Sequence, residues 1–132
     1  MSIEAYREAA SAGDIEGVSE QLAEDVVLHS PVVFHPFEGR PLATEVLRAV
    51  FDVFEDFRFT DHVAGDDLHT LVFRARVGDR ELEGVDVLRP DADGKIATFT
   101  VMIRPFTGLQ AFMEAMGPRI EAIAGGQAAP AG

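Results

Sequence analysis

One acidic residue in the second half of the chain stands in an unusual setting. In residues 80–90 (RELEGVDVLRP), the alternation of a β-strand puts Asp86 on the same face as Leu82 and Leu88. If that face is buried, loss of hydration raises the pKa of the Asp86 carboxyl and keeps a proton available for donation near neutral pH. An aspartate paired with an arginine, or burial of the opposite strand face, is the structural alternative.

The single tyrosine of the chain, Tyr6, lies in a segment with helical periodicity. Together with Ile3 and Ala9 it forms an apolar stripe at helical spacing, so its hydroxyl needs a partner if the stripe is buried. A phenol beside a protonated carboxylic acid would supply two hydrogen-bond donors to one developing oxyanion. The alternative is an amphipathic tyrosine in the core.

Residues 26–39 (VVLHSPVVFHPFEG) place polar side chains inside an apolar run. Ser30 lacks the surroundings of a nucleophile elbow and can bond the local backbone before Pro31. His35 lies in the expected loop and titrates near neutral pH, which makes it a candidate general base. A purely structural role in the loop is the alternative for His35.

Metal chemistry has little support in the sequence. No cysteine is present, and the histidines show neither an HExxH motif nor the i, i+4 spacing of a helical metal pair. The four histidines are His29, His35, His62 and His69. The sequence therefore predicts no metal site.

Charge narrows the range of partners. The 23 acidic and 11 basic side chains give 132 residues a formal net charge of −12, without a Lys/Arg cluster. Nucleic acid and anionic membrane surfaces are therefore poor partners. No stretch approaches the about 18 apolar residues of a membrane span, and the N-terminal segment does not look like a secretion signal. The sequence predicts a soluble cytoplasmic protein.

The first half of the chain has helical periodicity interrupted by one strand. Asp14 can cap a short second helix, a strand begins near Asp25 and is broken by Pro31, and residues 41–54 form a third helix with Pro41 near its start. This order predicts helices that precede the main sheet.

The second half changes to a period of two. Four strands separated by Gly/Asp-rich turns are expected at residues 57–65, 68–78, 80–90 and 95–105. Thr107 can cap a last helix, and residues 121–132 are expected to form a disordered tail after one domain at residues 1–120. The prediction is an α+β fold with N-terminal helices on a strongly curved, mostly antiparallel sheet that encloses a conical pocket.

Two long runs carry a family resemblance. Residues 6–39 (YREAASAGDIEGVSEQLAEDVVLHSPVVFHPFEG) and 84–105 (GVDVLRPDADGKIATFTVMIRP) resemble the ketosteroid isomerase and SnoaL-like branches of the NTF2-like superfamily. The resemblance implies an NTF2-like cone, with Tyr6 and Asp86 at the two oxyanion-hole positions. Ketosteroid isomerase is the established example of a carboxylic acid kept neutral by an apolar site.

The resemblance breaks at the catalytic base. Where the isomerases have an aspartate before the loop proline, this chain has Ser30, followed by Pro31 in the same register. A serine cannot replace a carboxylate in abstracting a proton from carbon, and His35 is the nearest substitute. SnoaL-like cyclases use an acid–base aspartate and no cofactor, for which Asp86 is the closest match. An epoxide-hydrolase-like Asp-Arg-Asp set is incomplete, since only Asp86 and Arg104 are candidates.

The favoured reading is a cofactor-independent isomerase or cyclase that acts on a small apolar carbonyl compound, with Tyr6, Asp86 and His35 as catalytic residues. The alternatives are a non-catalytic domain that binds a small ligand, and an interaction module whose cone is filled by side chains. In each case we expect a homodimer through the outer sheet face. The expected ligand-binding residues are Ser30, Leu28, Phe54, Leu88, Met102 and Arg104.

Overall fold

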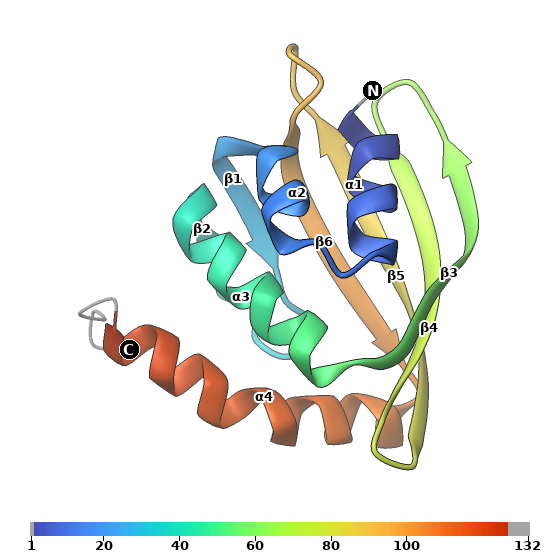
Figure 1. The fold of residues 1–132 in the computed structure, drawn as a ribbon, viewed down its shortest axis with the longest axis vertical. Helices are drawn as coiled ribbons and strands as arrows, with labels where there is room; N and C mark the ends of the chain where they lie inside the picture. Colours follow the sequence, from blue (N-terminus) through green and yellow to red (C-terminus); the bar gives the residue numbers. More distant parts are fainter. Residues whose placement is uncertain (1, 127–132) are drawn as a thin grey trace.

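The computed structural model describes residues 2–126, which form four helices and six strands (Figure 1). In chain order these are α1 (Ser2–Ser11), α2 (Ile15–Glu20), β1 (Leu22–His29), β2 (Phe37–Glu38), α3 (Arg40–Val53), β3 (Glu55–Ala64), β4 (His69–Val77), β5 (Arg80–Pro90), β6 (Ile96–Arg104) and α4 (Phe106–Gly126). The predicted α+β class, with a period change after the third helix, is confirmed.

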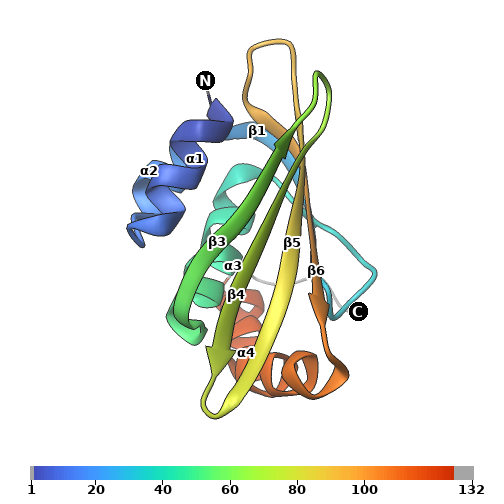
Figure 2. The same cartoon turned by 90° about the vertical axis from the view of Figure 1, so that its right-hand side faces the viewer.

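The strands form one curved, open sheet in the order β2-β1-β6-β5-β4-β3. All neighbouring strands run antiparallel except β1 and β6, which run parallel. Helices α1, α2 and α3 cover one face of the sheet, and α4 runs across its end near the β4–β5 turn (Figures 1 and 2). The sheet and helices together enclose the interior in which the site residues lie.

Several boundaries follow from capping and burial. Asp14 caps α2 by accepting a hydrogen bond from the backbone N–H of Gly17 at 3.1 Å, as expected. Strand β1 begins at Leu22, earlier than predicted, since Leu22 and Ala23 are buried in the core. Helix α4 continues through Pro118 to Gly126, so residues 121–126 are helical although a tail was predicted there. Residues 127–132 lie outside the described residues.

The alternation predicted for the central strands is confirmed. Leu82, Asp86 and Leu88 of β5 are buried, and the residues between them are more exposed. On the outer face, Arg74 and Glu83 pair across β4 and β5 at 3.3 Å. Asp86 therefore faces the interior, where its charge has the least hydration.

An aromatic cluster fills the part of the interior above β3, β4 and β5. Neighbouring rings pack in contact: the centroid distance is 5.6 Å between Phe54 and Phe73 and 5.2 Å between Phe57 and Phe73. The ring of Phe73 covers Gly84, where an added Cβ would lie 2.2 Å from Phe73 Cζ. The aromatic cluster consists of Phe51, Phe54, Phe57, Phe59, Phe73 and Phe112.

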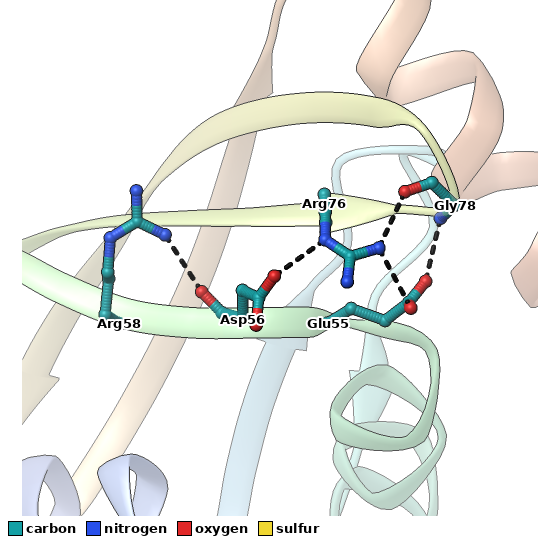
Figure 3. A network of polar contacts seen from close by, with 5 residues as sticks. All are labelled: Glu55, Asp56, Arg58, Arg76 and Gly78. Atoms are coloured by element: carbon teal, nitrogen blue, oxygen red, sulfur yellow. Dashed lines mark hydrogen bonds and ion pairs between the residues drawn. The ribbon is translucent and has the colours of Figure 1, made fainter.

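A polar network ties the start of β3 to the β4–β5 turn (Figure 3). Arg76 donates to Asp56 Oδ2 at 2.7 Å, to Glu55 Oε1 at 3.0 Å and to the carbonyl of Gly78 at 2.8 Å. The Gly78 N–H in turn donates to Glu55 Oε2 at 2.8 Å. Asp56 has a φ of 54°, in the left-handed region, where the pairing register of β3 shifts. The network holds this irregular strand end in place.

Among the helices of residues 2–126, none combines the length and the apolar character needed to cross a membrane.

Candidate functional site

Tyr6 and Asp86, 80 positions apart in sequence, are joined by a hydrogen bond. The Tyr6 hydroxyl donates to Asp86 Oδ2 at 2.6 Å, and the two residues are only 1% and 3% exposed. Burial raises the pKa of Asp86 to about 7, although the hydrogen bond from Tyr6 opposes this rise. Burial first, and the nearby Asp86 charge second, raise the pKa of Tyr6. Asp86 thus exchanges its proton near neutral pH while Tyr6 keeps its own.

The surroundings of the pair explain its low hydration. The Tyr6 ring packs edge-on against Phe99 and Phe59, at centroid distances of 5.3 and 6.1 Å. Asp86 lies between its cross-strand partners Leu71 of β4 and Val101 of β6. A carboxyl held among aromatic and aliphatic side chains gains little from ionising, which is the cause of its raised pKa.

The hydrogen bond also decides which oxygen of Asp86 is available. Because Oδ2 accepts from Tyr6, the acidic proton of the neutral form resides on Oδ1. Oδ1 has no hydrogen-bond partner among the described residues. Every fully buried side-chain oxygen or nitrogen of these residues does have a partner, so Oδ1 is not fully buried. Oδ1 therefore keeps a small opening to solvent. The pair presents one donor, Asp86, supported by Tyr6, in place of the two parallel donors expected from the sequence.

A cavity of about 170 Å³ lies beside this pair, between α3, α4, β6 and the end of β1. A cavity of about 150 Å³ is large enough for a single aromatic ring. It is lined by Leu28, Ser30, Pro31, Val32, Val33, Phe37, Val46, Leu47, Val50, Val101, Phe112, Met113, Met116, Gly117 and Ile120. These side chains are apolar apart from that of Ser30.

Val101 connects the cavity with the acidic pair. It lines the cavity and is also the cross-strand partner of Asp86. Neither Tyr6 nor Asp86 is itself a lining residue. Val101 thus forms part of the cavity wall next to Asp86.

Two of the predicted ligand-binding residues line the cavity. Leu28 contributes from β1, and Ser30 follows directly after the last residue of that strand. Ser30 Oγ accepts a hydrogen bond from the backbone N–H of Val32 at 3.0 Å, which fixes the orientation of the serine side chain. The local backbone bond expected for Ser30 is therefore present.

The other predicted residues lie elsewhere. His35 is exposed in the loop and does not line the cavity. Phe54 belongs to the aromatic cluster, and Leu88 is fully buried in the core. Met102 is 54% exposed on the outer face, because Phe99 and Val101 take the inner positions of β6. Arg104, which was expected to bind ligand, instead pairs with Glu83 at 3.4 Å on the exposed surface.

Two histidines meet across β3 and β4, next to Arg7 of α1. His62 Nε2 lies 3.3 Å from His69 Nδ1, and Arg7 Nη1 lies 3.5 Å from His62 Nδ1. Burial, followed by the charge of Arg7, lowers the pKa of His62. Across residues 2–126 no three His, Cys, Asp or Glu side chains are grouped closely enough to hold a metal ion.

Most cavity-lining residues were missed at the sequence level, although their spacing contained the signal. Val46, Leu47 and Val50 share one face of α3, and Met113 and Met116 recur at helical spacing on α4. Such spacing is equally typical of ordinary core positions. Periodicity identifies the inner face of a helix, but it does not show whether side chains fill the space before it.

Comparisons with known proteins agree with this architecture. Residues 3–99 match the family described as SnoaL-like domain. A steroid delta-isomerase from Pseudomonas aeruginosa is 38% identical, with a TM-score of 0.86 over 92% of this chain and 90% of that one. An uncharacterised protein with a cystatin-like fold from Silicibacter pomeroyi is 30% identical, with a TM-score of 0.87 over 91% and 85% of the two chains.

A more distant structure shares the fold alone. The epoxide hydrolase/cyclase-like enzyme SalBIII, with a role in pyran ring formation in polyether salinomycin, is 19% identical. Its TM-score is 0.66 over 81% of this chain and 90% of that chain. No curated protein matches the sequence at a significant level.

Proposed function

This chain belongs to the SnoaL-like domain family, and we propose that it is a cofactor-independent isomerase- or cyclase-type enzyme for a small apolar carbonyl compound. One observation carries the proposal: Asp86 is a buried carboxyl with a pKa of about 7, hydrogen-bonded by Tyr6 beside an apolar cavity. The similarity to a steroid delta-isomerase over most of both chains supports the same class of reaction.

The chemistry proposed for Asp86 is acid assistance at oxygen. A ligand in the cavity would direct its carbonyl oxygen past Val101 towards Oδ1 of the neutral carboxyl. The Oδ1 hydrogen bond strengthens as negative charge develops on the ligand oxygen, because the site is preorganised and poorly hydrated. If the proton transfers, the carboxylate that remains is stabilised by the hydrogen bond from Tyr6.

The composition of the cavity favours some reactions over others. Its described lining residues include no carboxylate and no histidine, and His35 is exposed in the loop. Acid assistance at a carbonyl oxygen therefore fits this lining better than proton abstraction from carbon. A role for His35 as base stays a prediction that requires the loop to move.

A second candidate is a domain that binds the same kind of ligand without altering it. The lining without a base and the position of Val101 between cavity and carboxyl favour this alternative. The filled-cone alternative draws support from the aromatic cluster, but the cavity argues against it. A homodimer through the outer sheet face and a cytoplasmic location stay predictions.

The proposal is tested with 4-ethylphenol, a ring-sized probe with one hydroxyl, titrated by fluorescence at several pH values. Asp86→Leu should weaken binding at pH 6 by roughly 2- to 10-fold, since the carboxyl is mostly neutral at that pH and a neutral hydrogen bond contributes about 0.5–1.5 kcal/mol. In the parent protein, affinity should change as pH passes about 7, where Asp86 ionises.

Asp86→Asn is the matched control, because its amide keeps a donor that does not titrate. It should bind the probe with no change in affinity across pH 7. Affinity that is the same in the parent protein and in Asp86→Leu would refute a role for Asp86. Binding of carbonyl compounds without turnover would favour the non-catalytic alternative.

A further inference from the structure

Ser30 holds a polar group in a cavity that is otherwise apolar. Its side chain is the polar one among the described lining residues, at the point where β1 ends and the loop begins. The Val32 N–H occupies one lone pair of Oγ at 3.0 Å, so the side-chain rotamer is set by the protein itself. Such a group is prepared to bind a ligand without the entropy cost of being ordered.

The hydroxyl hydrogen of Ser30 is not used by the protein. Oγ acts as acceptor in its hydrogen bond to Val32, and within residues 2–126 no acceptor for the Ser30 hydrogen is found. Because Ser30 is half-buried, this donor can bond either water or an acceptor that a ligand supplies. Ser30 therefore favours ligands with an oxygen at this end of the cavity.

The position of Ser30 relative to Asp86 limits the ligand further. His29 pairs with Thr100, so Ser30 lies beside Val101, while Asp86 pairs with Val101 from the other side. Ser30, just past the end of β1, and Asp86 of β5 are therefore separated by β6, a backbone spacing of about 10 Å. Val101 thus stands between Ser30, which lines the cavity, and Asp86, which lies behind the cavity wall.

Charge excludes ionic ligands from this space. No Lys or Arg is among the described residues that line the cavity, and the chain has a formal net charge of −12. An anion would meet neither a counter-charge nor water, and a cation would meet no carboxylate in the lining. The ligand that fits is neutral.

We propose that Ser30 is a specificity-determining residue that donates a hydrogen bond to a second oxygen of the ligand. The substrate class is then a neutral, ring-sized molecule with oxygen functions at two opposite ends, one for Asp86 and one for Ser30. This assignment rests on the proposed function, since it takes Asp86 as the contact for the first oxygen.

The test compares two probes that differ in one carbonyl, 4-hydroxyacetophenone and 4-ethylphenol, in the parent protein and in Ser30→Ala. Ser30→Ala should weaken binding of 4-hydroxyacetophenone by roughly 5–10-fold, the value of one neutral hydrogen bond. Binding of 4-ethylphenol should change less than about twofold, since it has no acceptor for Ser30. Damage to the loop would weaken both probes equally, and that result overturns the proposal.

Two further measurements keep the proposal testable if Ser30→Ala folds poorly. Ser30→Thr keeps the hydroxyl and should retain the preference for the ketone probe. In the parent protein, the infrared carbonyl stretch of bound 4-hydroxyacetophenone should lie at the lower frequency of a hydrogen-bonded ketone, and the frequency found in hydrocarbon solvent would overturn the proposal. If Ser30→Ala leaves the affinity for the ketone probe unchanged while Asp86→Leu still weakens it, this inference alone is refuted. If Asp86→Leu leaves the affinity for both probes unchanged, the proposed function is refuted.

Discussion

The two halves of the interior are both apolar, yet only one of them contains a cavity. Above β3, β4 and β5, rings pack against one another, and Phe73 lies flat over Gly84, which has no side chain to keep it away. Between α3 and α4 the walls are mostly aliphatic, among them Val50, Val101 and Met116, and Phe112 borders both halves. The aliphatic side chains leave this space open, whereas the rings of the other half fill theirs.

The comparison shows that the cavity and the Tyr6–Asp86 pair lie on opposite sides of Val101. The Tyr6–Asp86 pair is packed against Phe59 and Phe99, whereas the cavity begins on the far side of Val101. Packing on one side gives Asp86 its raised pKa, and the lack of packing on the other gives a ligand room. Both conditions meet at Val101.

The largest expected effect concerns the packed half and Asp86. The folded-state pKa of about 7 lies above the model-compound value of 3.8, so the unfolded chain loses this proton first as pH rises. The contribution of Asp86 to stability is therefore fully present below about pH 4 and is lost by pH 7 to 8. It corresponds to about 4 kcal/mol of unfolding free energy.

Urea unfolding of the parent protein and of Asp86→Asn between pH 4 and 8 measures this contribution. The difference in unfolding free energy between the two proteins should move in favour of the variant as pH rises, because an amide does not ionise. Curves that stay parallel over this range would show that Asp86 is hydrated and that the packed half is open.

The next effect compares one glycine from each half. Gly84→Ala should lower the free energy of unfolding by about 1–3 kcal/mol, since its Cβ would lie 2.2 Å from Phe73. Gly117→Ala is the matched control, because Gly117 lines the cavity in α4 with no heavy atom within 4 Å of an added Cβ. That change should be neutral or stabilise the helix by up to about 1 kcal/mol. Equal effects in thermal unfolding would remove the distinction between the halves.

The smallest expected effect lies on the surface next to the packed half. Arg76→Ala removes the hydrogen bonds to Asp56, Glu55 and Gly78 that hold the start of β3 (Figure 3). Because these groups are exposed, the melting temperature should fall slightly, and less so at high salt. Arg74→Ala, which removes one ion pair to Glu83, is the control and should have the smaller effect. A larger fall for Arg74→Ala would show that the network contributes nothing.

Local patterns predicted the polar pair but not most of the residues that line the cavity. Alternation put Asp86 on the buried face of β5, and the stripe on the first helix put Tyr6 inside, because both depend on neighbours in sequence. The bond between Tyr6 and Asp86 joins residues 80 positions apart, and its direction depends on how α1 crosses the sheet. Phe73 covers Gly84 only through pairing of two strands, and no single segment contains that information.

The residues that were predicted to belong to the site but lie outside it were misjudged for a similar reason. Met102 and Arg104 share a face of β6, as alternation requires, but Phe99 and Val101 occupy the inner one. His35 lies in a loop whose path is set by the pairing of β2 with β1. Strand register and loop path are tertiary properties, so the sequence identified the chemical groups better than their surroundings.

The parallel pairing of β1 with β6 has a consequence for synthesis of the protein. The cavity walls extend from Leu28 to Ile120, and the strand that contains Leu28 finds its neighbour only when residues 96–104 are available. A nascent chain that has emerged from the ribosome as far as β5 therefore has Tyr6 and Asp86 but lacks part of the cavity wall. Closing a contact over so many residues is also slow compared with local folding. The cavity is therefore complete only after β6 and α4 have been synthesised.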